Sequence, residues 1–219
     1  MAAIPGPDPA SNGEGASATR RRVVDAAVAC ILERGFYRAS SNEIARRAGV
    51  TWGVIQHYFG TREALLVAVL DDGARRFHEE MAAARVDGGT AQERLGQLVD
   101  VLVVHYSRPR YLAYLQILLN LDHDPTTSAD VRRTMQDVAE RSEAHLHRLL
   151  GEALGPTAET PGLATTVFLL LRGFGISQQL QETMAYDSVV PQRDRTAMDR
   201  RRLADMLTAY LRAPRSLGA

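Results

Sequence analysis

Residues 40–59 read SSNEIARRAGVTWGVIQHYF, and this stretch decides the fold of the chain. Ser40 followed by Glu43 is a capping-box pattern, which places a helix start at Ser40 because each side chain satisfies an orphan backbone N–H. Gly49 suits the left-handed residue that ends such a helix, and Thr51 can cap the next one. The pattern predicts two short helices joined by a tight turn, which is a helix-turn-helix.

The second helix of a helix-turn-helix enters the major groove of DNA and presents its first residues to base edges. Trp52, Gln56 and His57 are therefore the predicted base readers, whereas Ile55 and Phe59 are expected to face supporting helices. An ordinary helical hairpin that binds nothing has the same local pattern. The stretch by itself leaves both interpretations open.

The flanking sequence favours DNA binding. Small, aromatic and basic residues recur there at fixed positions, namely Ala26-Ala27, Gly35-Phe36, Ser40, Ile44-Ala45, Ala48-Gly49-Val50-Thr51, Gly53, Tyr58-Phe59 and Arg62 before Glu63-Ala64-Leu65. From Arg20 to Leu66 this run resembles the DNA-binding domain of the TetR family of bacterial transcriptional repressors. The resemblance implies an all-α protein of about nine helices, with an N-terminal three-helix helix-turn-helix domain and a larger helical domain for ligand binding and dimerisation.

The resemblance also implies DNA contacts, at Ser40, Asn42, Thr51, Trp52, Gly53, Gln56, His57, Tyr58 and Arg62. Two of these positions depart from the family. Gln56 stands where the family usually has Tyr, and Arg62 stands where it usually has Lys; both positions commonly touch the DNA backbone. Arg62 keeps the positive charge and can bind a phosphate. Gln56 can bond to a phosphate or to an adenine edge, so the operator sequence does not follow.

Positive charge is concentrated around this motif. The whole chain has 26 basic and 26 acidic residues, which argues against a general polyanion binder. Residues 17–62, however, carry eight Arg and three acidic residues, a net charge of +5, and residues 63–219 carry a net charge of −3. Such a distribution is the electrostatic footprint of a nucleic-acid-binding domain.

The N-terminal segment and the cysteine content bear on the cellular compartment in which the protein is expected. Residues 1–18 are rich in Pro, Gly, Ala and Ser without a hydrophobic block, so we expect a disordered arm, no signal peptide and a cytoplasmic protein. The single cysteine, Cys30, excludes an intrachain disulfide. It falls in the apolar pattern of the first helix, which favours a buried structural thiol over a redox sensor.

Beyond the arm the apolar residues recur at helical spacing, and no alternating strand pattern appears. We expect a DNA-binding domain over residues 19–66, whose first helix runs from about Thr19 to Arg34, and a ligand-binding and dimerisation domain over residues 67–219. Helices are expected there from Thr61 to Ala84, from Ala91, from Pro109, from Ser128 to Leu150, from Thr160-Pro161 to about Glu182, and after Arg193. The helix that starts at Thr61 would connect the two domains.

The helix expected from Thr160 is apolar nearly all round, so it must be buried on several sides. Arg172 and three glutamines interrupt it, which argues against a membrane span. The family resemblance implies that the last two helices pair with those of a second subunit. A palindromic operator also requires two recognition helices, one for each half-site, and one chain has a single helix-turn-helix. The alternative is that both helices pack inside a monomer.

The family typically holds a small-molecule pocket among its middle helices. The candidate lining residues are Tyr106, Tyr111, Tyr114, Asn120, Met135, Phe168 and Arg172. A mostly apolar set with few polar groups is typical of ligand pockets and predicts a small apolar or amphipathic effector. The aromatic residues can equally be ordinary core, and Arg172 can either bind an effector anion or pair with an acid across a dimer interface.

Metal binding and catalysis are not indicated. Asp122-His123-Asp124 precedes Pro125 in an expected turn, and His145 and His147, two apart on a helix, point to different faces. No phosphate-binding loop or nucleophile elbow occurs. We expect no metal, no cofactor and no enzymatic activity. The leading hypothesis is a homodimeric, ligand-responsive repressor of a palindromic operator; the alternative is a helical small-molecule-binding or interaction protein that does not read DNA sequence.

Overall fold

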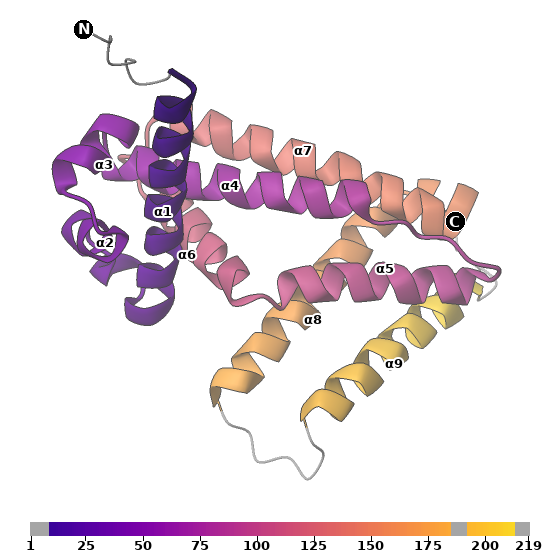
Figure 1. Cartoon of the computed structure of the whole chain (residues 1–219). Coiled ribbons are helices and arrows are strands. Elements are labelled where there is room, and N and C mark those ends of the chain that lie inside the picture. Colours follow the sequence, from indigo (N-terminus) through magenta and orange to yellow (C-terminus); the bar gives the residue numbers. More distant parts are fainter. Residues whose placement is uncertain (1–8, 185–191, 213–219) are drawn as a thin grey trace, which may run out of the picture. The chain divides into compact units, whose positions relative to one another are not determined.

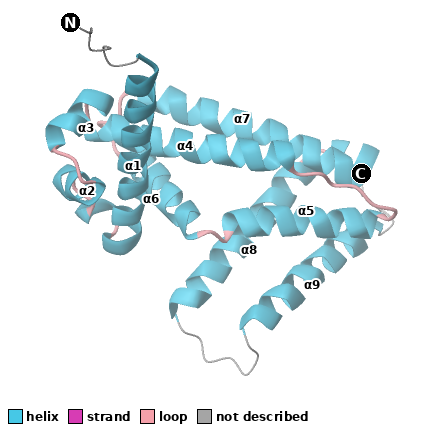
Figure 2. Ribbon diagram, viewed as in Figure 1, coloured by secondary structure: helices cyan, strands magenta, loops and turns pink. Residues whose placement is uncertain are grey.

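The computed structural model of the chain describes residues 9–184 and 192–212, and these residues form helices without any strand (Figures 1 and 2). The α-helices are α1 (Pro9–Arg34), α2 (Ser41–Ala48), α3 (Trp52–Phe59), α4 (Arg62–Ala83), α5 (Ala91–Tyr106), α6 (Pro109–His123), α7 (Ala129–Leu154), α8 (Leu163–Met184) and α9 (Gln192–Arg212). Two 3₁₀ turns, η1 (Phe36–Arg38) and η2 (Gly155–Glu159), join them. The predicted all-α fold is confirmed.

The helices form two compact units. Unit 1 contains the described residues up to Gly73 together with Leu112–Val138, and unit 2 contains Ala74–Tyr111 together with the described residues from Ala139 onward. Helices α4, α6 and α7 each contribute residues to both units. The functional domains over residues 19–66 and 67–219 stay a prediction.

Unit 1 is built on α1, which packs against η1 and α2, while α2 packs against α3. Its core contains side chains that are fully buried, among them Ile31, Ile44, Ile55, Leu65 and Leu66. Cys30 is also buried, as the sequence predicts, and burial raises the pKa of its thiol. A contact with α6 supports η1, the turn that leads into α2. The Phe36 N–H donates a hydrogen bond to the Gln116 side chain of α6.

Unit 2 is built on α5, which packs against both α8 and α9. The apolar side chains at its centre are almost completely withdrawn from solvent and include Met81, Leu98, Leu102, Leu149, Leu150 and Leu171. Thr90 and Glu93 form a complete capping box at the start of α5, which the sequence analysis did not predict. No helix in the described part of the chain is both long and apolar enough to cross a membrane.

Two helix starts differ from the prediction. Helix α1 begins at Pro9, so residues 9–18, expected to be a disordered arm, are helical; residues 1–8 lie outside the described residues. A helix that is already nucleated extends at low cost, and proline is favourable at the first helical position. Helix α8 begins at Leu163, because Gly162 has a positive φ of 75° that an α-helix does not accommodate. Thr160 instead closes η2, its N–H donating to the Thr157 carbonyl.

Candidate nucleic-acid interface

Helix α2 starts where the capping pattern predicts. Ser40 has an extended backbone, and its hydroxyl accepts a hydrogen bond of 3.3 Å from the Glu43 N–H. The reciprocal half of the predicted capping box is absent, however, since the Ser40 N–H donates to the Arg38 carbonyl at 2.9 Å. The Glu43 carboxylate is thereby available for ion pairs with arginines.

The turn of the motif has the predicted geometry. Gly49 lies in the left-handed region with φ 67° and ψ 34°, and its N–H bonds back to the carbonyls of α2. Thr51 then caps α3, its hydroxyl accepting from the Val54 N–H at 3.4 Å. Thr61 caps α4 in the same way, at 3.0 Å from the Ala64 N–H. The helix-turn-helix therefore forms from the local signals read in the sequence.

Helix α3 places its side chains on two faces. Ile55 is fully buried, and Phe59 is half-buried under the guanidinium of Arg20, 5.4 Å from its ring centroid. Gln56 and His57 are exposed, as base readers must be, whereas Trp52 is half-buried. Of the other predicted contacts, Ser40, Asn42, Thr51 and Gly53 are exposed and Tyr58 is half-buried. The side chains named as readers thus lie at the solvent-facing side of the helix or at its margin.

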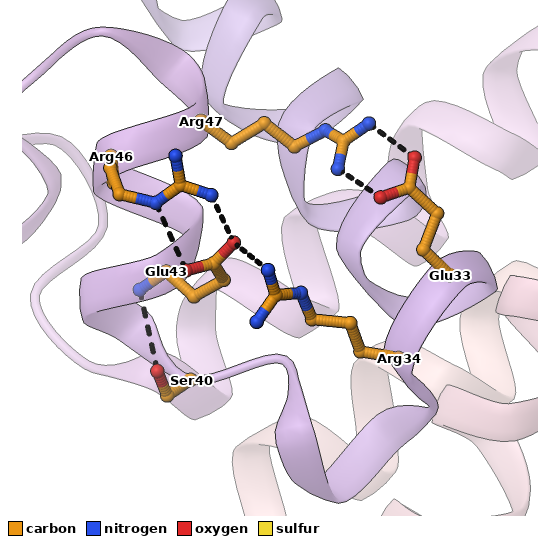
Figure 3. A network of polar contacts seen from close by, with 6 residues as sticks. All are labelled: Glu33, Arg34, Ser40, Glu43, Arg46 and Arg47. Carbon is orange, nitrogen blue, oxygen red and sulfur yellow. Dashed lines mark hydrogen bonds and ion pairs between the residues drawn. The ribbon is translucent and has the colours of Figure 1, made fainter.

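Four arginines of the positively charged segment already have partners in unit 1. Arg34 and Arg46 both bind the Glu43 carboxylate, at 3.1 and 2.6 Å, and Arg47 forms a two-bond pair with Glu33 of α1 (Figure 3). These contacts lower the pKa of Glu43 and of Glu33, chiefly through the arginine hydrogen bonds. Much of the local positive charge is therefore neutralised by the protein itself.

Arg62 is the fourth of these arginines. One terminal nitrogen of its guanidinium donates to the Phe36 carbonyl at 2.9 Å, and the group also bonds to the Ala39 carbonyl at 3.4 Å. The guanidinium carbon lies 4.8 Å from the centroid of the Phe36 ring. Burial lowers the pKa of Arg62. Phosphate binding by Arg62 stays a prediction, and it would compete with these internal bonds.

Four predicted effector-site residues belong to unit 2. Tyr106 and Tyr111 stack edge to face with their centroids 4.9 Å apart, and the Arg172 guanidinium carbon lies 5.6 Å from the Tyr106 centroid. Burial raises the pKa of Tyr111 to about 12. Phe168 is buried in the core of the unit, whereas Arg172 is exposed. An aromatic cluster with one cation at its edge is thus present, joined by His105, 5.3 Å from Tyr106.

The other three predicted effector-site residues belong to unit 1. Tyr114 is buried and packs tightly on Gly73, where an added Cβ would stand 2.6 Å from the Tyr114 ring. Asn120 donates to the Gln116 carbonyl at 2.7 Å, and Met135 is half-buried. A groove of about 790 Å³ lies elsewhere in unit 2, between α5 and α9, and is lined by charged side chains including Glu93, Asp100, Arg200 and Asp205. None of the seven predicted residues lines that groove.

Residues 23–69 match the sequence model of the N-terminal domain described as "Bacterial regulatory proteins, tetR family". This match covers the helix-turn-helix whose caps, turn and exposed helix are described above. Residues 23–69 are therefore a TetR-family DNA-binding domain. TetR-family regulators act by binding DNA and not by catalysis.

Some known proteins are similar to the chain over more than this domain. The HTH-type transcriptional regulator BetI of Rhizobium meliloti is 29% identical over 165 residues, which are 74% of this chain and 78% of BetI. Among solved structures, FadR of Bacillus subtilis in complex with stearoyl-CoA has a TM-score of 0.58 at 19% identity, covering 88% of this chain and 97% of FadR. The multidrug-binding protein EbrR complexed with imidazole has a TM-score of 0.59 at 20% identity, covering 91% and 98%.

Sequence reasoning missed the internal role of Arg62 and the exposed pair Tyr37 and Arg38 in η1. The partners of Arg62 lie 23 and 26 residues away in the chain, so no short-range pattern indicates them. Tyr37 is 85% exposed, whereas its neighbour Phe36 is buried. Within the described residues, no three His, Cys, Asp or Glu side chains gather in a way that would hold a metal ion.

Proposed function

We propose that this protein is a homodimeric, ligand-responsive transcriptional repressor of the TetR family that binds a palindromic operator and is released from it by a small effector. The observation that carries the proposal is the combination of a capped α3 with exposed Gln56 and His57 at its solvent face. In a helix-turn-helix these are the positions from which side chains reach base edges. Gln suits adenine, and we expect Tyr58 and Asn42 to contact the DNA backbone.

Dimerisation is proposed to occur through α8 and α9. Both helices expose large apolar side chains in the single chain, namely Leu169, Leu170, Leu180, Met198, Met206 and Tyr210. An apolar surface of this kind favours association with another protein surface. A second copy is the occupant that fits, because a palindromic operator needs two identical reading heads about one helical turn apart.

The proposed effector is apolar or amphipathic. The aromatic residues Tyr106, Tyr111 and Phe168 offer an apolar lining, and Arg172 offers a cation for one anionic group. FadR of Bacillus subtilis in complex with stearoyl-CoA and EbrR complexed with imidazole support a small-molecule effector, since both share this fold.

The proposed response is a shift between two forms of the dimer. Helix α4 carries residues of both units, so a change in its tilt would alter the spacing of the two α3 helices. The effector can shift this equilibrium only by its difference in affinity for the two forms. Operator affinity then falls when the effector-bound form no longer matches successive major grooves.

A competing function is a helical small-molecule-binding or interaction protein without sequence-specific DNA reading. The half-buried Trp52 at the head of α3 is the observation that favours it. Selection of bound duplexes from a random-sequence pool separates the two functions. The repressor proposal requires a recurrent palindrome, and substitution of Gln56 or His57 by alanine should change the preferred bases. His123→Ala, an exposed histidine outside the motif, should leave the preference unchanged. Recovery of no preferred sequence by the native chain would reject DNA reading.

The dimer is tested by molar mass in solution at micromolar concentration. Met206→Glu and Leu169→Glu place charges in the proposed interface and should shift the protein to monomer. Leu119→Glu is the matched control, because Leu119 is an equally exposed leucine on α6. A native chain that is monomeric, or a control that dissociates as readily as the interface variants, would contradict the proposed interface.

A further inference from the structure

The eight arginines between residues 17 and 62 fall into two groups. Arg34, Arg46, Arg47 and Arg62 have partners within unit 1, as described above. Arg20, Arg21, Arg22 and Arg38 are exposed, and Arg20 is the one of these that contacts a ring, that of Phe59. Within the described residues Arg38 forms no ion pair or hydrogen bond through its side chain. A free guanidinium can bind phosphate without first losing a protein partner, so this second group carries the charge available to DNA.

The free arginines lie at two separate places along the chain: Arg20, Arg21 and Arg22 lie near the middle of α1, and Arg38 lies beyond its C-terminal end. Arg20, near the middle of α1, contacts the last residue of α3, whereas Arg38 lies in η1, which follows the C-terminal end of α1 and leads into α2. Figure 1 shows α3 beside the first part of α1 and α2 beside the last part. Arg22 and Arg34 are twelve residues apart, about 18 Å along a helix. The major groove is about 12 Å wide, so cations separated by such a length, at the middle of α1 and beyond its C-terminal end, can reach phosphates on both of its sides.

The η1 turn is held in a fixed position from inside the protein. Its first residue, Phe36, donates its N–H to Gln116 at 3.2 Å and accepts from Arg62 at 2.9 Å through its carbonyl. Tyr37 packs edge to face on Phe36, with centroids 5.4 Å apart and an interplanar angle of 89°, yet is 85% exposed. A donor and a cation presented on an ordered turn lose less conformational freedom on binding than they would on a mobile loop.

We propose that Tyr37 and Arg38 form a DNA-backbone contact on the opposite side of the helix-turn-helix from Arg20, Arg21 and Arg22, and that Arg62 positions this contact instead of binding phosphate itself. Arg38 binds a phosphodiester oxygen and the Tyr37 hydroxyl donates to the same strand. The Arg62 bonds to Phe36 and Ala39 hold the turn against the start of α4. This inference rests on the proposed function and deepens it.

The salt dependence of DNA binding tests the proposal. The logarithm of the binding constant falls with the logarithm of salt concentration, with a slope of about 0.9 per phosphate contact. The probe is the duplex that the native full-length chain selects from a random pool, titrated between about 50 and 300 mM salt. Arg38→Ala should reduce the slope by about 0.9 and weaken binding several-fold. Arg47→Ala, an arginine that already has a carboxylate partner, is the matched control and should keep the slope.

The role of Arg62 is tested by two single variants and by a double variant with Arg38. Arg62→Lys keeps the charge but cannot bond to two carbonyls with a planar fork, so it should weaken binding like Arg62→Ala. The double variant of Arg38 and Arg62 to Ala should lose no more slope than Arg38→Ala alone. Three results would overturn the proposal. They are a salt slope in Arg38→Ala equal to that of the native chain, a decrease in slope of about 1.8 in the double variant, and DNA binding by Arg62→Lys as tight as that of the native chain.

The outcomes also separate this inference from the function on which it rests. If the native chain selects no sequence, the proposed function fails. If it selects a sequence and Arg38→Ala binds with an unchanged slope, only the η1 contact is rejected. Circular dichroism of each variant confirms folding, and Arg38→Ala tests the contact even if Arg62→Ala does not fold, because Arg38 is exposed.

Discussion

Gly175 of α8 lies so close to Tyr106 of α5 that a Cβ on Gly175 would stand 2.6 Å from the Cβ of Tyr106 and 3.0 Å from its carbonyl carbon. No side chain larger than hydrogen fits there unless the two helices separate. Tyr106 is itself nearly buried and contacts Tyr111 and Arg172. The close approach therefore sets the position of the aromatic cluster that we propose for the effector.

Gly175→Ala is expected to destabilise the protein by about 1 to 3 kcal/mol, because overpacking moves the backbone of α5 or α8. Gly173 lies on the same helix with nothing within 4 Å of an added Cβ. Gly173→Ala should be neutral or stabilising by up to about 1 kcal/mol, as alanine is the better helix former. Chemical denaturation of both variants measures the difference. Equal stability of the two would show that the helices separate at little cost.

Tyr111 is expected to make stability fall at alkaline pH. Burial raises its folded pKa to about 12 from the usual 10.0, so the unfolded chain loses this proton first as pH rises. The stabilisation is complete below pH 10 and is lost between about pH 10 and 12. Thermal melts across this range, with tyrosinate absorbance, measure the effect. Tyr111→Phe should lose less stability over the same interval than the native chain or Tyr37→Phe, and an identical loss would contradict the assignment.

His145 is expected to reduce stability at mildly acidic pH. Its Nε2 lies 2.6 Å from Nδ1 of His78 on α4, and burial, His78 and Arg148 together lower the folded pKa of His145 below 6.5. The unfolded chain therefore takes up this proton first, and stability falls as pH drops below about 6.5. His145→Gln should show a smaller decrease in melting temperature from about pH 7.5 to 5 than the native chain. His147→Gln, on the same helix, is the control, and equal decreases in both variants would argue against this role.

The Thr51 hydroxyl is expected to stabilise α3. It accepts a hydrogen bond from the Val54 N–H, and removing such a cap costs about 1 kcal/mol. Thr51→Ala should lower the free energy of unfolding by that amount and weaken operator binding, since the first turn of α3 would fray. Thr51→Ser keeps the oxygen and should stay within a few tenths of a kcal/mol of the native chain. If serine and alanine were equivalent, the hydroxyl would have no capping role.

Local signals predicted the motif well. Ser40, Thr51 and Thr61 each accept a hydrogen bond from a residue three positions ahead, and Gly49 adopts the left-handed conformation expected of it. Interactions of this kind depend on residue types within one turn, so the sequence contains them completely. The start of α8 was predicted wrongly, because Thr160-Pro161 also suits the end of a 3₁₀ turn and Gly162 then separates it from the helix.

Contacts between distant residues were not predictable in this way. Glu43 was expected to bond back to Ser40, but Arg34 and Arg46 take its carboxylate, and the choice depends on where α1 ends. The seven effector candidates were chosen by residue type, and the structure places four in unit 2 and three in unit 1. Helical periodicity indicates which side chains face inward, and it does not say which of them meet.

The sequence by itself determined the all-helical fold, the helix-turn-helix and the resemblance of this domain to the TetR family, because caps, turns and apolar spacing act over three or four residues. Only the tertiary structure decided which arginines are free for DNA and where Arg62 bonds. The reason is physical: a guanidinium binds whichever carboxylate or carbonyl the packing of helices brings within about 3 Å, and that partner can lie anywhere in the chain.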